Sequence, residues 1–301
     1  MTARMEVDGV HGDVPDTEYH ADRSALSSSG ARLLLPPSTP AHFRAAMSQP
    51  PKTKREYDFG HAAHKFVLGE GEEIVPVHAN DWRTNAAKEQ RAQAYADGKI
   101  PLLAREVDVA MEMARAVFNH PTARKLLADG VAEVSLAATD PETGIRLKAR
   151  PDWMNPEGGR LRIVDYKTST TSDPSTFSRK AFDLGYHIQE AWYRAVARLA
   201  RLDPEAQFVF IVQEKEYPYE VAVVEFDDEA ALLGAQMMQR AIAIYRDCID
   251  RDIWPGRPTD ITSISLPSWA TRASRWVEST REDNSDLIAA LEAALTEGTP
   301  E

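Results

Sequence analysis

The apolar residues of this 301-residue chain change their spacing near residue 132, and this change limits the fold more than any other feature. Before that point, apolar residues recur at helical spacing, as over 59–68 and 106–118, while residues 70–100 are polar and predict irregular structure. After it, apolar residues follow the spacing of strands, with turns rich in Gly, Pro, Asn and Asp between them. The pattern predicts a three-stranded meander made of residues 132–138, 145–152 and 161–167.

The segments after the meander are expected to complete one domain. Their pattern predicts a helix, two strands and a helix, at residues 174–201, 207–214, 220–226 and 228–251. No linker separates them, so we predict a single α/β domain with a central mixed β-sheet flanked by helices. This domain is expected to span residues 19–275, between a mobile N-terminal arm at 1–18 and an acidic C-terminal tail at 276–301.

Composition excludes several classes of protein. The one cysteine, Cys248, excludes a disulfide framework and any four-cysteine zinc or iron–sulfur site, and it suits a reducing compartment. Residues 1–20 lack an apolar run after a basic stretch, so we expect no secretory signal. No stretch approaches the roughly 18 apolar residues of a membrane span, so we expect no contact with a membrane.

Two acidic residues and a lysine come together in the second half of the meander. Asp165 and Lys167 are two apart on a strand, so their side chains point to the same face. Asp152 ends the preceding strand, and the turn between the strands brings it beside Asp165. Two adjacent carboxylates repel one another, which a divalent cation relieves, and a lysine can stabilise developing negative charge. This favours a hydrolytic metal site over solvated acids and a surface ion pair.

These residues resemble a known signature. Pro151-Asp152 followed by Asp165-Tyr166-Lys167 is similar to the signature of the PD-(D/E)XK nucleases. Motifs placed around it narrow the resemblance to the RecE-type exonucleases (exodeoxyribonuclease VIII) of phages and prophages, and the main ones are Gly60-His-Ala-Ala-His64 and Gln189-Glu-Ala-Trp-Tyr193. The resemblance implies the PD-(D/E)XK fold. It also implies a metal-dependent exonuclease that degrades double-stranded DNA from 5′ ends, releases 5′-mononucleotides and leaves 3′ single-stranded tails for homologous recombination.

The resemblance also implies the residues of a metal site. Asp152 and Asp165 resemble the metal-binding acids, the backbone carbonyl of Tyr166 is a further ligand, and Lys167 resembles the catalytic lysine. The expected metal is Mg²⁺, with Mn²⁺ as a substitute, and no iron–sulfur cluster is expected.

Two further metal ligands are suggested, each with an alternative. His64 resembles the histidine that completes the metal site, although a lone helical histidine is often a packed or surface residue. Glu133 is expected either to hold a second metal or a water, or to be a surface acid at the start of a strand.

Side chains on the helix after the second acid are expected to bind the scissile phosphate. Gln189 and Tyr193 are four apart and share a helix face, and Tyr186 lies one turn earlier. Their amide and phenol groups can fix the attacking geometry, with simple packing as the alternative for the tyrosines. Ser29 resembles a serine that contacts the terminal 5′-phosphate. The expected DNA-binding residues are Ser29, Arg150 and Thr168.

The charge of the chain is divided unevenly along its length. The net charge of −12 argues against a protein coated uniformly with basic groups. Residues 146–201 contain eleven basic and six acidic residues, a net charge of +5, so the remainder carries −17. We therefore expect DNA phosphates to bind only where the meander and the helix after it line a groove.

Two other functions remain open at this point. One is a PD-(D/E)XK endonuclease or a nuclease of another polarity. The other is a non-catalytic scaffold that binds DNA ends, although a scaffold has no need of all three of Asp152, Asp165 and Lys167. The resemblance further implies double-stranded DNA ends as substrate, a single-strand annealing protein as partner, a ring-shaped homo-oligomer, and the cytoplasm of a bacterial host cell.

Overall fold

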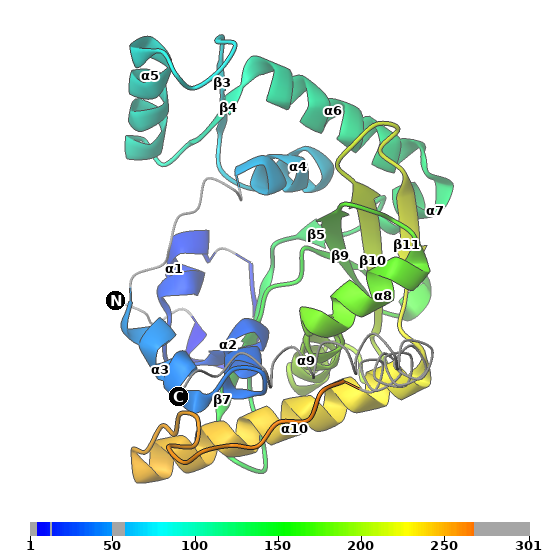
Figure 1. Cartoon of the computed structure of the whole chain (residues 1–301). Helices are drawn as coiled ribbons and strands as arrows, with labels where there is room; N and C mark the ends of the chain where they lie inside the picture. Colours follow the sequence, from blue (N-terminus) through cyan, green and yellow to red (C-terminus); the bar gives the residue numbers. More distant parts are fainter. Residues whose placement is uncertain (1–4, 13, 50–57, 268–301) are drawn as a thin grey trace, which may run out of the picture. The chain divides into compact units, whose positions relative to one another are not determined.

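The structure is a computed structural model that describes residues 5–12, 14–49 and 58–267 (Figure 1). The chain divides into two compact units, residues 1–256 and 257–301. The first unit contains all the helices and strands of the described residues, and it is the unit considered below. The predicted acidic tail at 276–301 lies outside the described residues.

A five-stranded mixed sheet forms the centre of this unit. Its strand order is β11-β10-β9-β8-β5. The strands β9 and β10 are parallel, and the other neighbours are antiparallel. The bounds are β5 Val131–Ala132, β8 Trp153–Asn155, β9 Arg162–Ser169, β10 Gln207–Glu214 and β11 Val221–Val224. The predicted central mixed sheet is therefore confirmed.

A second sheet has four strands in the order β1-β6-β7-β2. A third sheet consists of the parallel strands β3 and β4. The bounds are β1 Gly9–His11, β2 Leu26–Ser27, β3 Ile74–Val77, β4 Ile100–Leu103, β6 Ser135–Thr139 and β7 Arg146–Ala149. The predicted continuous meander is thus wrong, because its strands are shared between two sheets.

Two breaks in the chain cause this division. Pro151 lacks an amide hydrogen for strand pairing, and it lies between β7 and β8. Glu133 has a φ of 53° and separates β5 from β6. The backbone N–H of Glu133 donates to the carbonyl oxygen of Asp152 over 3.2 Å, so the two breaks lie side by side. Asp152 accordingly sits in a connection between sheets and not at a strand end.

Ten helices are described. They are α1 Asp16–Ala21, α2 Ser28–Leu34, α3 Pro40–Ser48, α4 Asp58–Leu68, α5 Asn85–Ala96, α6 Ala104–Asn119, α7 Pro121–Leu126, α8 Pro174–Asp183, α9 Tyr186–Leu199 and α10 Asp228–Arg251. The helix predicted over 174–201 is two helices, because Gly185 adopts a left-handed conformation with a φ of 68° between α8 and α9. The segment 70–100, predicted to be irregular, contains β3, α5 and the start of β4.

The five-stranded sheet buries a different hydrophobic cluster on each face. Ile163 of β9 packs with α2, α8, α9 and α10 on one side. Val164 and Tyr166 of the same strand pack with α4 and α6 on the other side, and Figure 1 shows these two groups of helices on opposite sides of the sheet. Because side chains alternate along a strand, Asp165 and Lys167 face the side of α9.

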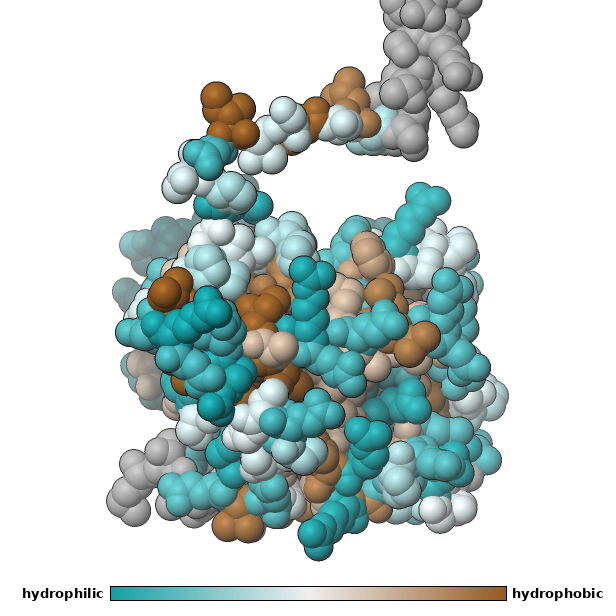
Figure 2. Space-filling model, turned by 90° about the horizontal axis from the view of Figure 1, so that it is seen from below, coloured by the Kyte–Doolittle hydropathy of each residue, from teal (hydrophilic) through white to brown (hydrophobic). Residues whose placement is uncertain are grey.

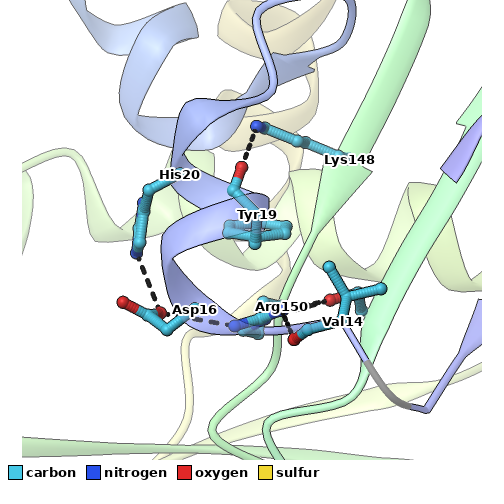
Figure 3. A network of polar contacts seen from close by, with 7 residues as sticks. Val14, Asp16, Tyr19, His20, Lys148 and Arg150 are labelled. Atoms are coloured by element: carbon cyan, nitrogen blue, oxygen red, sulfur yellow. Dashed lines mark hydrogen bonds and ion pairs between the residues drawn. The ribbon is translucent and has the colours of Figure 1, made fainter. Parts of the chain in front are cut away.

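The N-terminal segment is part of the fold where it is described, so the predicted mobile arm is wrong there. β1 pairs with β6, and Met5, Val14 and Tyr19 are buried against the small side chain of Ala137. Figure 3 shows the contacts that hold this segment. The ring of Tyr19 lies 4.6 Å from the Lys148 ammonium and 4.4 Å from the Arg150 guanidinium, which are cation–π distances.

The side of the molecule that carries α10 is largely hydrophilic, with separate apolar areas (Figure 2). Within the part of the chain that the structure describes, no helix combines the length and the apolar character needed to cross a membrane.

The contact between α9 and α10 depends on a glycine. A Cβ added at Gly234 would overlap the backbone carbonyl of His187, which cannot move without moving α9. We expect Gly234→Ala to lower the free energy of unfolding by about 1–3 kcal/mol, as measured by urea denaturation. Gly60 of α4 is the matched control, since an added Cβ there meets no atom within 4 Å. Gly60→Ala should instead stabilise by about 0.5–1 kcal/mol, and equal effects of the two changes would contradict the assignment.

Candidate functional site

Four of the predicted site residues meet on the α9 side of β9. Asp165 is fully buried, and its Oδ2 lies 2.6 Å from Nζ of Lys167. Its Oδ1 accepts a hydrogen bond of 2.7 Å from Nε2 of Gln189 on α9. Nζ of Lys167 also lies 4.9 Å from the ring centre of Tyr186. Both oxygens of the buried acid are therefore held by side chains that the sequence predicts at the site.

Asp152 and His64 meet from the two sides of this arrangement. Oδ2 of Asp152 accepts a hydrogen bond of 2.9 Å from the backbone N–H of Tyr166, which fixes the carboxylate against β9. The same oxygen lies 3.6 Å from Nδ1 of His64 on α4. The imidazole of His64 packs edge-on against the ring of Tyr166, with 5.0 Å between ring centres. The structure thus gives His64 the position near the acids that the resemblance implies.

Three side chains in this region could hold a metal ion. Ligand atoms of His64, Glu133 and Asp152 all lie within 4.8 Å of one another. Two carboxylates and one imidazole are donors that suit a divalent cation. Asp165 lies beside this group but directs its oxygens to Lys167 and Gln189. Direct ligation by Asp165 and by the carbonyl of Tyr166 stays a prediction.

Burial shifts the pKa values of two of these candidate metal ligands, Glu133 and His64. It raises the pKa of Glu133 to about 8, with a further contribution from the Asp152 carboxylate. It lowers the pKa of His64 to about 4, with a further contribution from the charge of Lys167. At neutral pH the imidazole is therefore uncharged and has a free lone pair, whereas Glu133 lacks a positive partner strong enough to keep it ionised. A divalent cation would supply that partner, so these residues fit one.

Burial and neighbouring charges also shift the pKa values of the ion pair on β9. Burial raises the pKa of Asp165 to about 6, and the Asp152 carboxylate adds to this shift. Burial also raises the pKa of Asp152. For Lys167, burial by itself would lower the pKa, but the two carboxylates outweigh it and raise the pKa above its ordinary value. The lysine is therefore a cation at neutral pH.

The two predicted tyrosines differ in exposure. Tyr193 is buried, packs against the ring of Phe208, and has a pKa far above its ordinary range because of burial. Tyr186 stacks on Phe210 and faces Lys167, with a pKa that burial also raises. Packing accounts for most of the Tyr193 side chain, and Tyr186 is better placed to meet a substrate.

One cleft has a volume of about 1550 Å³ and is lined by His64, Glu133, Asp152, Lys167, Tyr186, Gln189 and Tyr193. Asp165 is fully buried and contacts Lys167 and Gln189 of this lining. Ser29 of α2 lines the cleft as well, and its Oγ lies 3.0 Å from Oγ of Ser27. The side chain of Ser27 accepts from the backbone N–H of Gly30 and caps α2. The cleft thus joins β9 and α9 to α2 and to the metal-binding group.

Of the other two predicted DNA contacts, Arg150 is among the residues that line the cleft, whereas Thr168 is not. Arg150 is buried, and its guanidinium donates to the backbone carbonyl of Val14 and to Oγ of Ser135, with Asp16 at 3.3 Å (Figure 3). It holds the N-terminal segment through these contacts. Thr168 follows Lys167 on β9, so its side chain points to the opposite face of the sheet and away from the cleft.

Sequence reasoning missed a buried support behind the site. The hydroxyl of Tyr166 donates to Oε1 of Gln213 over 2.5 Å, and Nε2 of Gln213 donates to the carbonyl of Met113 in α6 over 2.8 Å. This network fixes the residue whose N–H holds Asp152. The available signal was a glutamine in the otherwise apolar strand 208–213. The rim residues Asp16, His20 and His61 were also missed as cleft-lining groups.

Residues 27–266 match the model of a protein family described as a PDDEXK-like domain of unknown function (DUF3799). The chain belongs to this family. Its membership in the PD-(D/E)XK nuclease superfamily and its fold class are therefore as predicted, and Asp152, Asp165 and Lys167 provide the signature residues of a PD-(D/E)XK protein.

One solved structure supports the fold of this PD-(D/E)XK protein. A protein of Eubacterium rectale described as a putative exonuclease gives a TM-score of 0.55 at 13% identity, covering 85% of this chain and 94% of its own. A phage-related exonuclease of Haemophilus somnus gives a TM-score of 0.29 at 14% identity, covering 76% of this chain and 96% of its own. None of the curated proteins matches this chain significantly.

The raised pKa of Glu133 predicts a dependence of stability on pH. The protonated form is favoured in the folded state, so this stabilising contribution is complete below the ordinary pKa of 4.5 and is lost as the pH rises through about 8. In EDTA, we expect Glu133→Gln to match the wild type near about pH 5 and to be more stable near about pH 8.5, by on the order of 1–3 kcal/mol. Urea unfolding at the two pH values measures this. Glu70→Gln, at an exposed cleft residue, is the control for loss of one charge, and a pH-independent gain in Glu133→Gln would contradict the prediction.

Proposed function

We propose that this protein is a Mg²⁺-dependent exonuclease that degrades double-stranded DNA from 5′ ends, releases 5′-mononucleotides and leaves 3′ single-stranded tails for homologous recombination. The observation that carries the proposal is that Lys167 and Gln189, both in contact with the buried Asp165, line a single cleft together with the candidate metal ligands His64, Glu133 and Asp152. Membership in a PDDEXK-like family supports nuclease chemistry, and the description of the Eubacterium rectale protein supports an exonuclease.

Each polar group of the site has a part in this proposal. Lys167 is held as a cation by Asp165, so its ammonium can stabilise negative charge on the phosphate as water attacks. Gln189 holds the other oxygen of Asp165 and keeps the carboxylate in one orientation. The ring of Tyr186 restricts Lys167 and shields it from bulk water on one side.

The metal-binding group supplies the remaining chemistry. Mg²⁺, or Mn²⁺ in its place, would be held by His64, Glu133 and Asp152 next to Asp165, and when bound it would polarise the phosphate and lower the pKa of a water molecule. The buried, mutually repelling carboxylates would gain a positive partner at the same time.

The biological setting is part of the proposal. It comprises double-stranded DNA ends as substrate, a ring-shaped homo-oligomer around the DNA, a single-strand annealing protein that takes over the 3′ tail, and the cytoplasm of a bacterial cell. Its support is the likeness of the ordered motifs to RecE-type exonucleases.

The shape of the DNA substrate tests the reaction. With Mg²⁺, we expect linear duplex DNA to be degraded to mononucleotides and closed-circular duplex to stay intact, and we expect EDTA to abolish the reaction. Linear duplexes labelled at the 5′ or the 3′ end report the polarity, because the 5′ label should be released first. Cutting of the circle would instead indicate an endonuclease. Binding of ends without hydrolysis in either Mg²⁺ or Mn²⁺ would indicate a scaffold.

Removal of the lysine tests the site. We expect Lys167→Ala to lower the rate of hydrolysis by about 10²-fold or more, because the developing charge loses its buried cation. Binding of the same DNA, measured by fluorescence anisotropy with Ca²⁺ in place of Mg²⁺, should change far less. Arg179→Ala removes an exposed cation of α8 and is the control for charge alone. A Lys167→Ala protein with the wild-type rate would exclude this site.

A further inference from the structure

Arg32 extends from α2 into the cleft that holds Lys167 and Gln189. One of its guanidinium nitrogens donates to the backbone carbonyl of Leu184, which caps α8. Its charge is close enough to interact with Asp165, Tyr186 and Tyr193. The sequence pattern gives no hint of this position, because Arg32 lies on a short helix more than a hundred residues before the other groups.

The guanidinium of Arg32 has no carboxylate partner in the part of the chain that the structure describes. Among the described residues, no carboxylate lies within ion-pair distance of it, whereas Arg44, Arg146 and Arg194 each have one. The side chain is only partly exposed, so its charge is partly removed from water. A guanidinium has five N–H donors, and a partly buried cation without a counter-charge is costly unless an anion is bound. The donors that Leu184 does not use are therefore available to an anion in the cleft.

The backbone beside Arg32 is shaped to receive this side chain. Gly185 joins α8 to α9 with a φ of 68°, and a Cβ added there would lie 2.6 Å from Cδ of Arg32. Glycine is therefore required at this position for two reasons. It adopts the left-handed conformation, and it leaves room for the aliphatic part of the Arg32 side chain. The result is a guanidinium held at a fixed place above the start of α9.

We propose that Arg32 binds a phosphate group of the DNA strand in the cleft. This inference rests on the proposed function, and it makes Arg32 a second cation of the site beside Lys167. Lys167 is engaged with Asp165, whereas Arg32 keeps a fork of donors whose geometry matches two phosphate oxygens. The two cations have different tasks: Lys167 stabilises charge in the reaction, and Arg32 positions the strand.

Binding without hydrolysis tests this assignment. The full chain with Ca²⁺ is titrated with a fluorescent linear duplex at several salt concentrations. We expect Arg32→Gln to bind about tenfold more weakly, as loss of a charge-assisted contact implies, and to lower the slope of log K against log salt by about one. Arg32→Lys keeps the charge but not the fork, so it should restore the salt slope and part of the affinity. Arg179→Gln is the control for loss of one charge, since this exposed cation of α8 is not among the residues that line the cleft.

A modified substrate identifies the phosphate. In a series of duplexes, one phosphate at a time is replaced by an uncharged methylphosphonate. The wild type should lose affinity at one position near the end, and Arg32→Gln should be insensitive at that position alone. Unchanged affinity and salt slope in a folded Arg32→Gln protein, or the same pattern of losses in both proteins, would overturn the assignment.

The two proposals can fail separately. If the wild type does not hydrolyse DNA but Arg32→Gln loses binding and salt slope, the proposed function is wrong and the phosphate contact stands. If the wild type hydrolyses linear DNA and Arg32→Gln has the same KM and kcat, the function stands and the contact is wrong. Thermal unfolding of Arg32→Gln and Arg32→Lys shows whether a loss of binding reflects a loss of folding.

Discussion

The rest of the site depends on one buried ion pair, Asp165 with Lys167. A carboxylate without exposure to solvent is costly to ionise, so it needs partners on every side. Lys167 and Gln189 provide two of them, and the contact from Gln189 requires α9 to pack directly against β9. The opposite face of β9 is equally constrained, because the ring of Tyr166 must fit between α4 and α6. A polar centre of this kind can form only inside a nearly complete core.

The division of the sheet positions two candidate metal ligands, Glu133 and Asp152. In a continuous meander, Asp152 would lie within a strand. Its side chain would then point either to the α9 face or to the α4 face of the sheet. The two breaks instead put Glu133 and Asp152 in adjacent connections, tied by one backbone hydrogen bond. From there, both carboxylates reach His64 on α4 while Asp152 stays fixed to the N–H of Tyr166. The irregular backbone between the two sheets therefore brings both carboxylates close to His64, which regular strands could not do.

Local patterns in the sequence predicted which residues come together at the candidate site. They predicted less well which parts of the chain pack around those residues. Alternation on β9 placed Asp165 with Lys167, and helical spacing placed Gln189 on the face that meets them. Arg150 was expected to bind DNA, but its guanidinium contacts the N-terminal segment, more than 130 residues away in sequence. The break at Gly185 was missed because only the packing of α8 and α9 requires a left-handed residue there. Residues 70–100 were missed because their short strands pair with each other and bury few large side chains.

The cleft is assembled from both ends of the first unit, with walls that include Val14 before α1 and Trp254 after α10. A ribosome therefore delivers Val14 long before Trp254. The signature acids and the lysine leave the ribosome about a hundred residues before Trp254 does. A nascent chain therefore carries the reactive residues well before it can enclose them, and the complete cleft exists only when translation of the unit has finished.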